Sequence, residues 1–447
     1  MNHSRDNFTG FLAVVLAAAG SAIGLGNIWR FPYIMGMYGG GAFLLVYLLF
    51  VLGLGVPLML SEFAIGRRSQ SNLVRAFQKS APGTRWHYIG IMGIVASILI
   101  MAFYTTISGW TLEYTLKMAM GAFRGADATA VDSMLTQFIS QPVMPIVYQS
   151  IFLGVSGWIV MRGVQKGIET FSKILMPLLA IILVVLAIRS LLLEDASKGL
   201  AFMFKPDFSK LTLQGILSAL GQAFFSLSLG MGCMLTYGSY IKKDEILLKT
   251  SLAVVFFDTF FAVTAGVIIF PAVFSFGIAP NAGVDLIFKT LPMVFQMMPF
   301  GELFGALFFI LVMIAALTSI ISLLEVGVSY FVEETGASRT KATIGVMGVV
   351  MLLGVLATWS FGPLKDTVFG GKTFFDWFDY LTANVMLPLG AIAISLFVGW
   401  YWTKKASVDE LTNGTPRHVR HVRLFFFVIR YVAPLAILAI FVSGIVG

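Results

Sequence analysis

The sequence predicts an all-α integral membrane protein that crosses the bilayer eleven times. Of its 447 residues, 58% are apolar and only 12% are charged, and the mean hydropathy is +0.90. A soluble protein carries about 25% charged residues, so this chain has too little polar surface to cover soluble domains. The apolar residues also form runs of about 20 or more, which is the length that a membrane-spanning helix needs.

Other classes of protein are disfavoured by the same composition. The one cysteine, Cys233, cannot form an intramolecular disulfide, and the four histidines lack the spacing of metal ligands. The net charge of +8 comes mainly from Lys and Arg in short segments between apolar runs. That pattern is typical of membrane topology, so we expect no nucleic-acid partner.

The predicted spans follow from the apolar runs in order. They cover residues 11–36, 41–65, 87–120, 143–161, 167–191, 214–240, 248–275, 301–333, 341–359, 375–402 and 424–446. Two connecting segments, 121–141 and 276–299, are predicted to be ordered at the outer face. No segment is long and polar enough for a separate soluble domain, so residues 1–447 are predicted to form one domain.

The distribution of Lys and Arg predicts the orientation of the chain. Basic residues are more frequent in alternate segments, beginning with the N-terminal one and including Arg67, Arg68 and Lys242. Because cytoplasmic segments carry the excess of Lys and Arg, the N-terminus is predicted to be cytoplasmic. Eleven spans then place the C-terminus outside.

The first span contains a segment that is unusual for a membrane helix. Gly20, Gly24 and Gly26 stand close together, and each costs about 1 kcal/mol relative to alanine inside a helix. Such residues can serve close helix packing, but here Asn27 and Arg30 follow. An arginine within an apolar span usually faces a cavity, so we predict that the helix is unwound here.

The sixth span contains a second interruption, SLSLGMG at residues 226–232. Spans one and six occupy matching places in two groups of five spans. Interrupted helices at matching positions indicate an inverted-repeat transporter with a binding site near the bilayer midplane. The predicted repeats are residues 1–191 and 214–402, with 424–446 as an additional helix.

These two segments carry a resemblance to a known family. Together with AALTS at residues 315–319 and FD at 378–379, they identify the sequence as similar to the neurotransmitter:sodium symporter family, in its bacterial branch. The resemblance extends from residue 5 to about residue 434, but the chain lacks the twelfth span of many members. It implies a sodium-coupled symporter of the bacterial cytoplasmic membrane that works by alternating access.

The resemblance implies two sodium sites, of which one lies between the first and eighth spans. Its ligands would be the carbonyls of Gly20, Ile23 and Ala315 and the hydroxyls of Thr318 and Ser319. Taken alone, these two hydroxyls would be interpreted as bonding back to the preceding helical turn. The interpretation as a sodium site therefore depends on the matching motif in the first span.

The second sodium ion would touch the substrate. Its implied ligands are the Ala22 carbonyl, the Asn27 side chain, Ser226 and Asp258. An aspartate within an apolar span costs about 2.5–3.5 kcal/mol on insertion, which a bound cation would offset; the alternative is a structural carboxylate paired with a neighbouring donor. Many members have asparagine in place of Asp258, and a fixed negative charge here predicts transport that does not need chloride.

The resemblance also implies the substrate pocket, in which backbone amides and the Tyr104 hydroxyl hold a carboxylate. The residues of this pocket would be Ala22, Leu25, Gly26, Ile100, Tyr104, Phe225, Ser226, Ser228, Met231, Ser319, Ser322 and Leu323. Amine-transporting members carry an aspartate at the position of Gly24. Because the implied lining is mostly apolar and uncharged, we expect neutral, hydrophobic or aromatic amino acids as substrates.

Two gates are implied in the same way. Outside, Arg30 would pair with Asp379 directly or through water, and Phe225 would close over Tyr104. Exposed ion pairs are worth only about 0–1 kcal/mol, which suits a gate that opens in every cycle. Inside, the gate would consist of Arg5, Glu333 and Tyr240.

Several alternatives remain at this level. The intramembrane residues Glu62, Glu113 and Glu325 could relay protons, but we interpret them as structural, with Glu62 bracing the first span. Lys372 follows two glycines but lacks the rest of a phosphate-binding loop. No nucleophile–base pair is evident, so we expect no enzyme activity.

A transport-inactive amino acid sensor on the same fold is the main alternative. The expected partners are the amino acid, sodium ions and the lipid bilayer, with the chain a monomer or weak dimer.

Overall fold

A computed structural model describes residues 6–277, 286–413 and 419–446. Within these residues the chain is helical and contains no β-strand beyond two isolated bridges, Gly40–Pro206 and Phe369–Lys372. Nine helical stretches in this part of the chain are long and apolar enough to cross a membrane. Five of them are single helices: His87–Ala119 (α6), Met144–Met161 (α8), Leu247–Ser275 (α13), Gly301–Thr335 (α15) and Arg339–Trp359 (α16). The other four contain a π-helical turn. They are Gly41–Ser69 (α3, Gly41–Phe50; η2, Val51–Gly55; α4, Val56–Ser69), Val164–Leu191 (η3, Val164–Glu169; α9, Thr170–Leu191), Phe374–Tyr401 (α17, Phe374–Tyr380; η6, Leu381–Met386; α18, Leu387–Leu396; η7, Phe397–Tyr401) and Val422–Gly444 (within α20, η9, Val428–Val432, and α21).

The first span is broken. Helix α1 (Phe11–Ala22) is followed by the π-helical turn η1 (Gly26–Arg30) and by α2 (Phe31–Met37), and the two halves are bent by 57°. The sixth span is broken as well, into α11 (Leu213–Ser226) and α12 (Cys233–Gly238). Both interruptions lie where glycine-rich sequence predicted them.

Nine predicted spans therefore match long apolar helices, and the first matches the bent pair. The predicted sixth span is present as two short helices, neither of which is long enough to cross a bilayer by itself. The count of eleven crossings and the five-plus-five repeat stay predictions.

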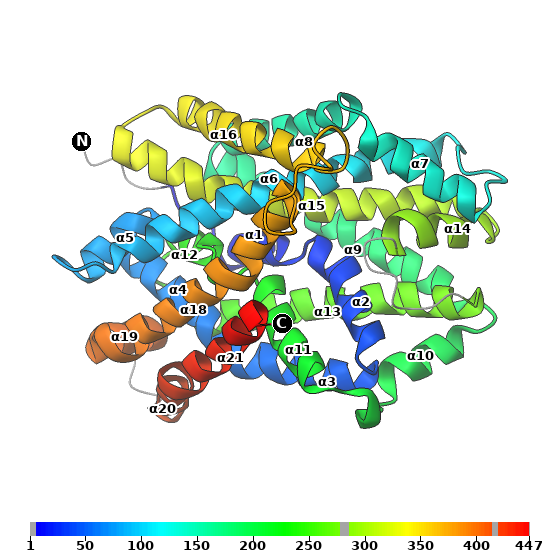
Figure 1. Cartoon of the computed structure of the whole chain (residues 1–447). Helices are drawn as coiled ribbons and strands as arrows, with labels where there is room; N and C mark the ends of the chain where they lie inside the picture. Colours follow the sequence, from blue (N-terminus) through cyan, green and yellow to red (C-terminus); the bar gives the residue numbers. More distant parts are fainter. Residues whose placement is uncertain (1–5, 278–285, 414–418, 447) are drawn as a thin grey trace.

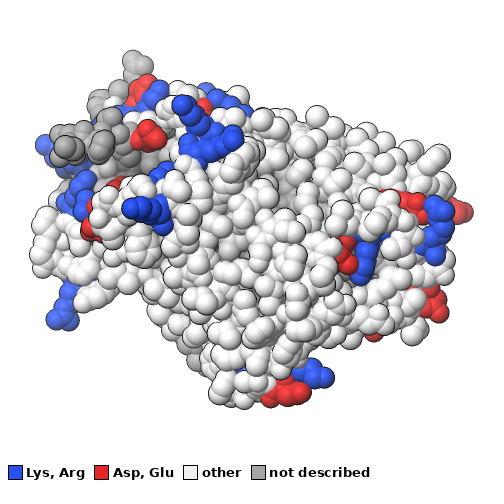
Figure 2. Space-filling model, turned by 90° about the horizontal axis from the view of Figure 1, so that it is seen from above, with Lys and Arg blue, Asp and Glu red and all other residues white. Residues whose placement is uncertain are grey.

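Short helices lie at the two ends of the long bundle (Figure 1). Helices α7 (Ala128–Ser140), α10 (Ala196–Phe204) and α14 (Leu291–Gln296) lie at one end. Helices α5 (Leu73–Ser80), α19 (Lys404–Thr412) and α20 (Val419–Phe427) lie at the other. The predicted order in the segments 121–141 and 276–299 is thus confirmed for their described residues. Figure 2 shows charged side chains mainly toward the left and right ends and at one lower edge, with a broad uncharged surface between them.

Helix α15 forms the centre of the bundle. In its most apolar window 78% of the residues are buried, compared with 28% in the last helical stretch, Val422–Gly444. It packs along α6 and also contacts α1, α8, α9 and α16. The last stretch, in contrast, lies at the periphery: Ile429, Ala433 and Ile437 are buried on one face, and most of the other side chains face outward.

Candidate functional site

The first break is held by side chains. Helix α1 ends at Ala22, and the chain resumes a helical path at Gly26. Within the break the Gly24 amide donates to Oδ1 of Asn27 (3.1 Å), and the Leu25 amide donates to the Tyr104 hydroxyl (2.8 Å). These amides thus obtain from side chains the partners that a continuous helix would have given them.

The sixth break, residues 227–232, is held by its own backbone conformation. Ser228, Gly230 and Gly232 have φ angles of 53°, 80° and 86°, in the left-handed region that favours glycine. A Cβ on Gly230 would lie 2.5 Å from the Leu387 carbonyl oxygen. No side chain larger than that of glycine fits at residue 230 without a shift of the α18 backbone.

Glu62 braces this sixth break. Its Oε1 accepts a hydrogen bond from the Gly230 amide (2.8 Å). The prediction that Glu62 braces the first span is therefore wrong. The reason is packing, because α4, which carries Glu62, lies along α12, and Gly66 allows close approach to the Leu235 backbone.

A small cavity lies between the two breaks. Its volume is 30 Å³, which is enough for about two water molecules. An amino acid can therefore enter only if side chains move. Its lining includes every predicted substrate-pocket residue except Leu25: Ala22, Gly26, Ile100, Tyr104, Phe225, Ser226, Ser228, Met231, Ser319, Ser322 and Leu323. Ser21, Gly24 and Asn27 complete it. Leu25 contributes through its amide contact with Tyr104.

Gly24 and Ser21 are informative members of this lining. A Cβ on Gly24 would lie 2.7 Å from both the Ser319 and the Tyr104 hydroxyl oxygens, so a larger side chain at residue 24 would fill the cavity. The Ser21 hydroxyl donates to that of Ser322 (2.7 Å). Ser21 was not among the predicted pocket residues, although it is adjacent to the predicted ligand Ala22.

Asp258 is fully buried in a group of neutral donors. The Ser226 hydroxyl lies 2.8 and 2.9 Å from its two carboxylate oxygens, and Nδ2 of Asn27 donates to one of them (2.8 Å). The Tyr47 hydroxyl, which the sequence analysis missed, lies at 3.5 Å. Among the described residues, no Lys or Arg forms an ion pair with Asp258. A buried charge without a counter-charge is costly, so this arrangement can accommodate a cation.

The residues of the other predicted sodium site also lie together. The Ser319 hydroxyl is 3.3 Å from the Ile23 carbonyl oxygen and 3.2 Å from that of Ala315, and the Thr318 hydroxyl is 3.0 Å from the Ala315 oxygen. A Cβ on Gly20 would lie 3.2 Å from Cβ of Thr318. Helix α15 therefore meets the end of α1 here through oxygen atoms. The alternative geometry, in which both hydroxyls bond back along α15, is present at the same time.

Arg30 and Phe225, both assigned to the predicted outer gate, lie side by side. The Arg30 guanidinium carbon lies 4.7 Å from the centroid of the Phe225 ring. Arg30 and Asp379 line one cavity of 140 Å³, together with Phe225 and Tyr104. Within the described part of the chain Arg30 and Asp379 are not within ion-pair distance of each other, so the direct pairing is not made in this conformation.

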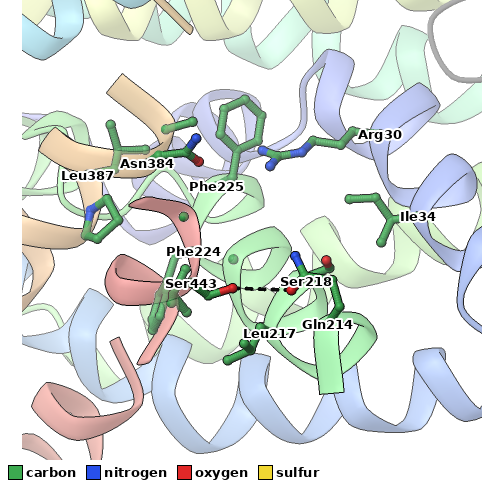
Figure 3. A pocket seen from close by; sticks show the side chains of 15 residues that line it. Arg30, Ile34, Gln214, Leu217, Ser218, Phe224, Phe225, Asn384, Leu387 and Ser443 are labelled. Carbon is green, nitrogen blue, oxygen red and sulfur yellow. Dashed lines mark hydrogen bonds between the residues drawn. The ribbon is translucent and has the colours of Figure 1, made fainter. Parts of the chain in front are cut away.

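A third cavity, of 190 Å³, lies on the other side of Arg30 (Figure 3). It separates α11 from the η6–α18 helix and from α21 (Ala433–Val446). Near its edge the Ser443 hydroxyl donates to Oε1 of Gln214 (3.3 Å). Phe225 lines this cavity, the 140 Å³ cavity and the central one, so a single ring forms part of the wall of all three.

In the predicted inner gate, Arg5 and its predicted pairing with Glu333 lie outside the described residues. Oε2 of Glu333 accepts hydrogen bonds from the backbone amide (2.8 Å) and from Nδ2 (3.1 Å) of Asn72. These bonds tie the end of α15 to the start of α5.

Tyr240, the third residue of the predicted inner gate, belongs to a separate cluster of side chains. Its hydroxyl donates to Oε1 of the buried Glu325 (2.5 Å), which also forms an ion pair with Arg339. Phe8 packs edge-on against the Tyr240 ring, with centroids 5.9 Å apart. Glu325 thus joins the sixth, eighth and ninth spans, and the sequence analysis missed Arg339 as its partner.

A bundle of long apolar helices, with two further spans broken around one cavity, is the architecture of a membrane transporter. The chain belongs to the Sodium:neurotransmitter symporter family, whose profile matches residues 5–124 and 134–447. It is therefore a transmembrane sodium-dependent symporter, in a family made of transporters rather than enzymes.

Individual relatives agree with this assignment. The chain is 40% identical to the uncharacterized sodium-dependent transporter YhdH of Bacillus subtilis, covering 97% of this chain and 96% of that protein. It is 27% identical to the human sodium- and chloride-dependent GABA transporter 2, covering 92% and 75%. Among solved structures it is similar to MhsT in complex with L-phenylalanine, with a TM-score of 0.91, 45% identity and coverage of 99% and 100%.

Proposed function

We propose that this protein couples sodium entry to the import of neutral, hydrophobic or aromatic amino acids by alternating access, without a need for chloride. The observation that carries the proposal is the small cavity between the two helix breaks. Its lining includes helix ends that present carbonyl groups and a helix end that presents amide groups, but no charged side chain. The likeness to a transporter bound to L-phenylalanine supports the same substrate class.

The helix ends around the cavity suit a zwitterion. Helices α1 and α11 end at Ala22 and Ser226 and direct their carbonyl ends toward the break, whereas η1 begins at Gly26 with its amide end. Carbonyl ends favour cations and amide ends favour anions. The substrate ammonium would therefore lie near Ala22 and Ser226, and its carboxylate near Gly26 and the Tyr104 hydroxyl.

The substrate side chain would occupy the apolar part of the lining. Ile100, Met231 and Leu323 line that part, and Phe225 separates it from the outer cavities. Methionine adapts to irregular shapes, so movement of Met231 and Phe225 would provide the space that 30 Å³ lacks. With no charge in the lining, an acidic or basic side chain would lose its hydration without compensation.

Two sodium ions would be held by oxygen atoms, as hard cations prefer. One would bind to Gly20, Ile23, Ala315, Thr318 and Ser319 in place of the hydroxyl contacts described above. The other would bind to Ala22, Asn27, Ser226 and Asp258. For Asn27 to supply its oxygen, its amide must turn over, because its nitrogen now faces Asp258.

Asp258 is the basis for chloride independence. Two sodium ions and a zwitterion give a closed site an excess of positive charge, and the low dielectric of the interior magnifies that excess. The Asp258 carboxylate would supply the missing negative charge from within the protein. An external anion would then be unnecessary.

Alternating access would require the two ends to open in turn. Arg30 and Asp379 would control the outer end, and Arg5, Glu333 and Tyr240 the inner end. We further propose the repeats 1–191 and 214–402, with 424–446 outside them, in a monomer or weak dimer. The protein would lie in the bacterial cytoplasmic membrane with its N-terminus inside.

The alternative is a transport-inactive amino acid sensor on the same fold. Uptake of labelled phenylalanine into proteoliposomes, with an inward gradient of sodium or of choline, separates the two. We expect uptake only with sodium, and competition by neutral apolar amino acids in a panel of all twenty. Sodium-dependent binding without accumulation would favour the sensor, and equal uptake in choline would contradict sodium coupling.

A further inference from the structure

A basic groove lies between α19 and the start of the last helical stretch. It has a volume of 520 Å³. Three of its lining side chains are cations, Lys404, Arg423 and Arg430, and three are aromatic, Phe426, Phe427 and Tyr431. The groove therefore combines positive charge with large apolar surfaces.

No acidic side chain lines the basic groove among the described residues. The nearby Glu410 of α19 is occupied by Arg67, whose Nε lies 2.6 Å from its Oε2. Nε of Arg430 donates to the Gly399 carbonyl (2.5 Å), and its guanidinium lies over the Phe426 ring at 5.1 Å. These contacts hold the Arg430 side chain in place without neutralising its charge. Within the described lining of the groove, none of the three cations, Lys404, Arg423 and Arg430, has an acidic partner.

An exposed apolar stripe continues from the groove along the last helical stretch. Its side chains recur at intervals of three or four residues, which places them on one helix face. They are Leu424 (63% exposed), Phe427 (56%), Tyr431 (47%), Leu435 (67%), Leu438 (46%) and Val442 (50%). In a membrane-spanning helix such a face contacts lipid chains.

We propose that the basic groove binds the phosphate headgroup of an anionic phospholipid, whose acyl chains lie along the apolar stripe. Guanidinium and ammonium groups suit phosphate, and basic pockets between helices at the cytoplasmic side are suited to anionic headgroups. The groove lies at the end of the molecule that carries α5, α19 and α20 (Figure 1), the end predicted to be cytoplasmic. The headgroup would join α19 to the last helical stretch, while Arg67 joins α19 to α4.

The test uses the full chain in liposomes and compares spin-labelled phosphatidylglycerol with spin-labelled phosphatidylcholine. The relative association of each lipid is read from its motionally restricted fraction. The groove variant is Lys404→Gln with Arg423→Gln, both exposed positions that can change without disturbing the core. Because each basic side chain near a membrane contributes about 1 kcal/mol to anionic lipid binding, the loss of two predicts a fall in the preference for phosphatidylglycerol of roughly thirty-fold.

Matched controls separate a site from general surface charge. Lys243→Gln with Lys341→Gln removes the same charge from exposed positions outside the groove and should retain the preference. Exchanging the groove cations, as Lys404→Arg with Arg423→Lys, should retain it too. Equal losses in the groove and control variants would overturn the proposal. The proposal would also be overturned if soluble glycerol phosphate displaced the labelled lipid as well as phosphatidylglycerol does. That result would indicate a phosphate site that does not require a lipid.

Discussion

The two helix breaks that meet at the central cavity are built differently. The first, residues 23–25, has no left-handed residue, and its amides are held by Asn27 and Tyr104. The sixth, residues 227–232, has three left-handed residues and is braced by the buried Glu62. A ligand can replace a side chain as the hydrogen-bond partner of a backbone amide. Left-handed φ angles, in contrast, depend mainly on the glycines present in the sequence and do not change when a ligand binds. We infer that the first break supplies the exchangeable ligand contacts and the sixth break supplies the rigid frame.

The strongest test of this difference is Gly230→Ala in the sixth break. Forcing a non-glycine residue into this backbone costs about 1–3 kcal/mol, and the added Cβ would also meet the Leu387 carbonyl oxygen at 2.5 Å. We expect a clear fall in the thermal unfolding midpoint in detergent, with or without ligand. Gly221→Ala in α11 is the control, since its Cβ would have only one neighbour, Cγ2 of Ile440, at 3.9 Å. It should raise helix stability by up to about 1 kcal/mol; equal midpoints for the two variants would contradict a rigid frame.

The next largest effect is expected for Thr318→Val with Ser319→Ala beside the first break. The change removes two hydroxyl oxygens and leaves apolar side chains, so sodium-stimulated substrate binding should be lost while the unfolding midpoint is kept. The control is Thr335→Val, which removes a hydroxyl bonded back to Phe331 on the same helix. Isothermal titration with sodium measures the affinity. Sodium affinity equal to that of the wild type in the double variant would refute the site.

A smaller effect is expected for Tyr104→Phe, which removes one hydroxyl from the first break. Loss of a hydrogen bond to a charged group costs about 1.5–3 kcal/mol, so substrate affinity should fall accordingly. The decarboxylated amine of the same substrate should lose much less affinity in this variant. If the amino acid and the amine weaken equally, Tyr104 does not meet the carboxylate.

The smallest effect concerns Asp258→Asn, which keeps the shape and an oxygen ligand but removes the charge. Uptake by the wild type should be the same in chloride and gluconate media. Uptake by the variant should be reduced, and it should recover at least in part when chloride is supplied. The measurement is initial uptake rate in both media for both proteins. A wild type that stops in gluconate, or a variant that behaves as the wild type in both media, would show that Asp258 does not balance the charge.

The positions of the spans could be predicted from the sequence because the bilayer requires long apolar runs. The predicted span 87–120 differs from α6, His87–Ala119, by one residue at its end. The breaks were predictable too, since glycine is costly inside a helix. Their exact form was not, because a backbone that turns left-handed at Ser228 carries no glycine there to signal it.

Partners from distant spans could not be predicted. Tyr47 near Asp258, Arg339 on Glu325 and Glu62 at the sixth break depend on which helices pack together. Their spacing along the chain carries no information about that packing. The direct Arg30–Asp379 pairing depends in addition on the conformation, which a sequence leaves open.

The position of Phe225 in the wall of three cavities has a kinetic consequence. A side-chain rotation takes picoseconds to nanoseconds when the ring is free to turn, whereas collective movements of helices take microseconds to milliseconds. If the Phe225 ring turns on the faster timescale, it connects or separates the cavities many times before any helix moves. Its rotation would govern how often a substrate enters, and Phe225→Leu should change the association rate more than the turnover rate. The slower movement of the helices would then commit a bound substrate to transport. A wrong substrate can leave in the interval after the ring has admitted it and before the helices move.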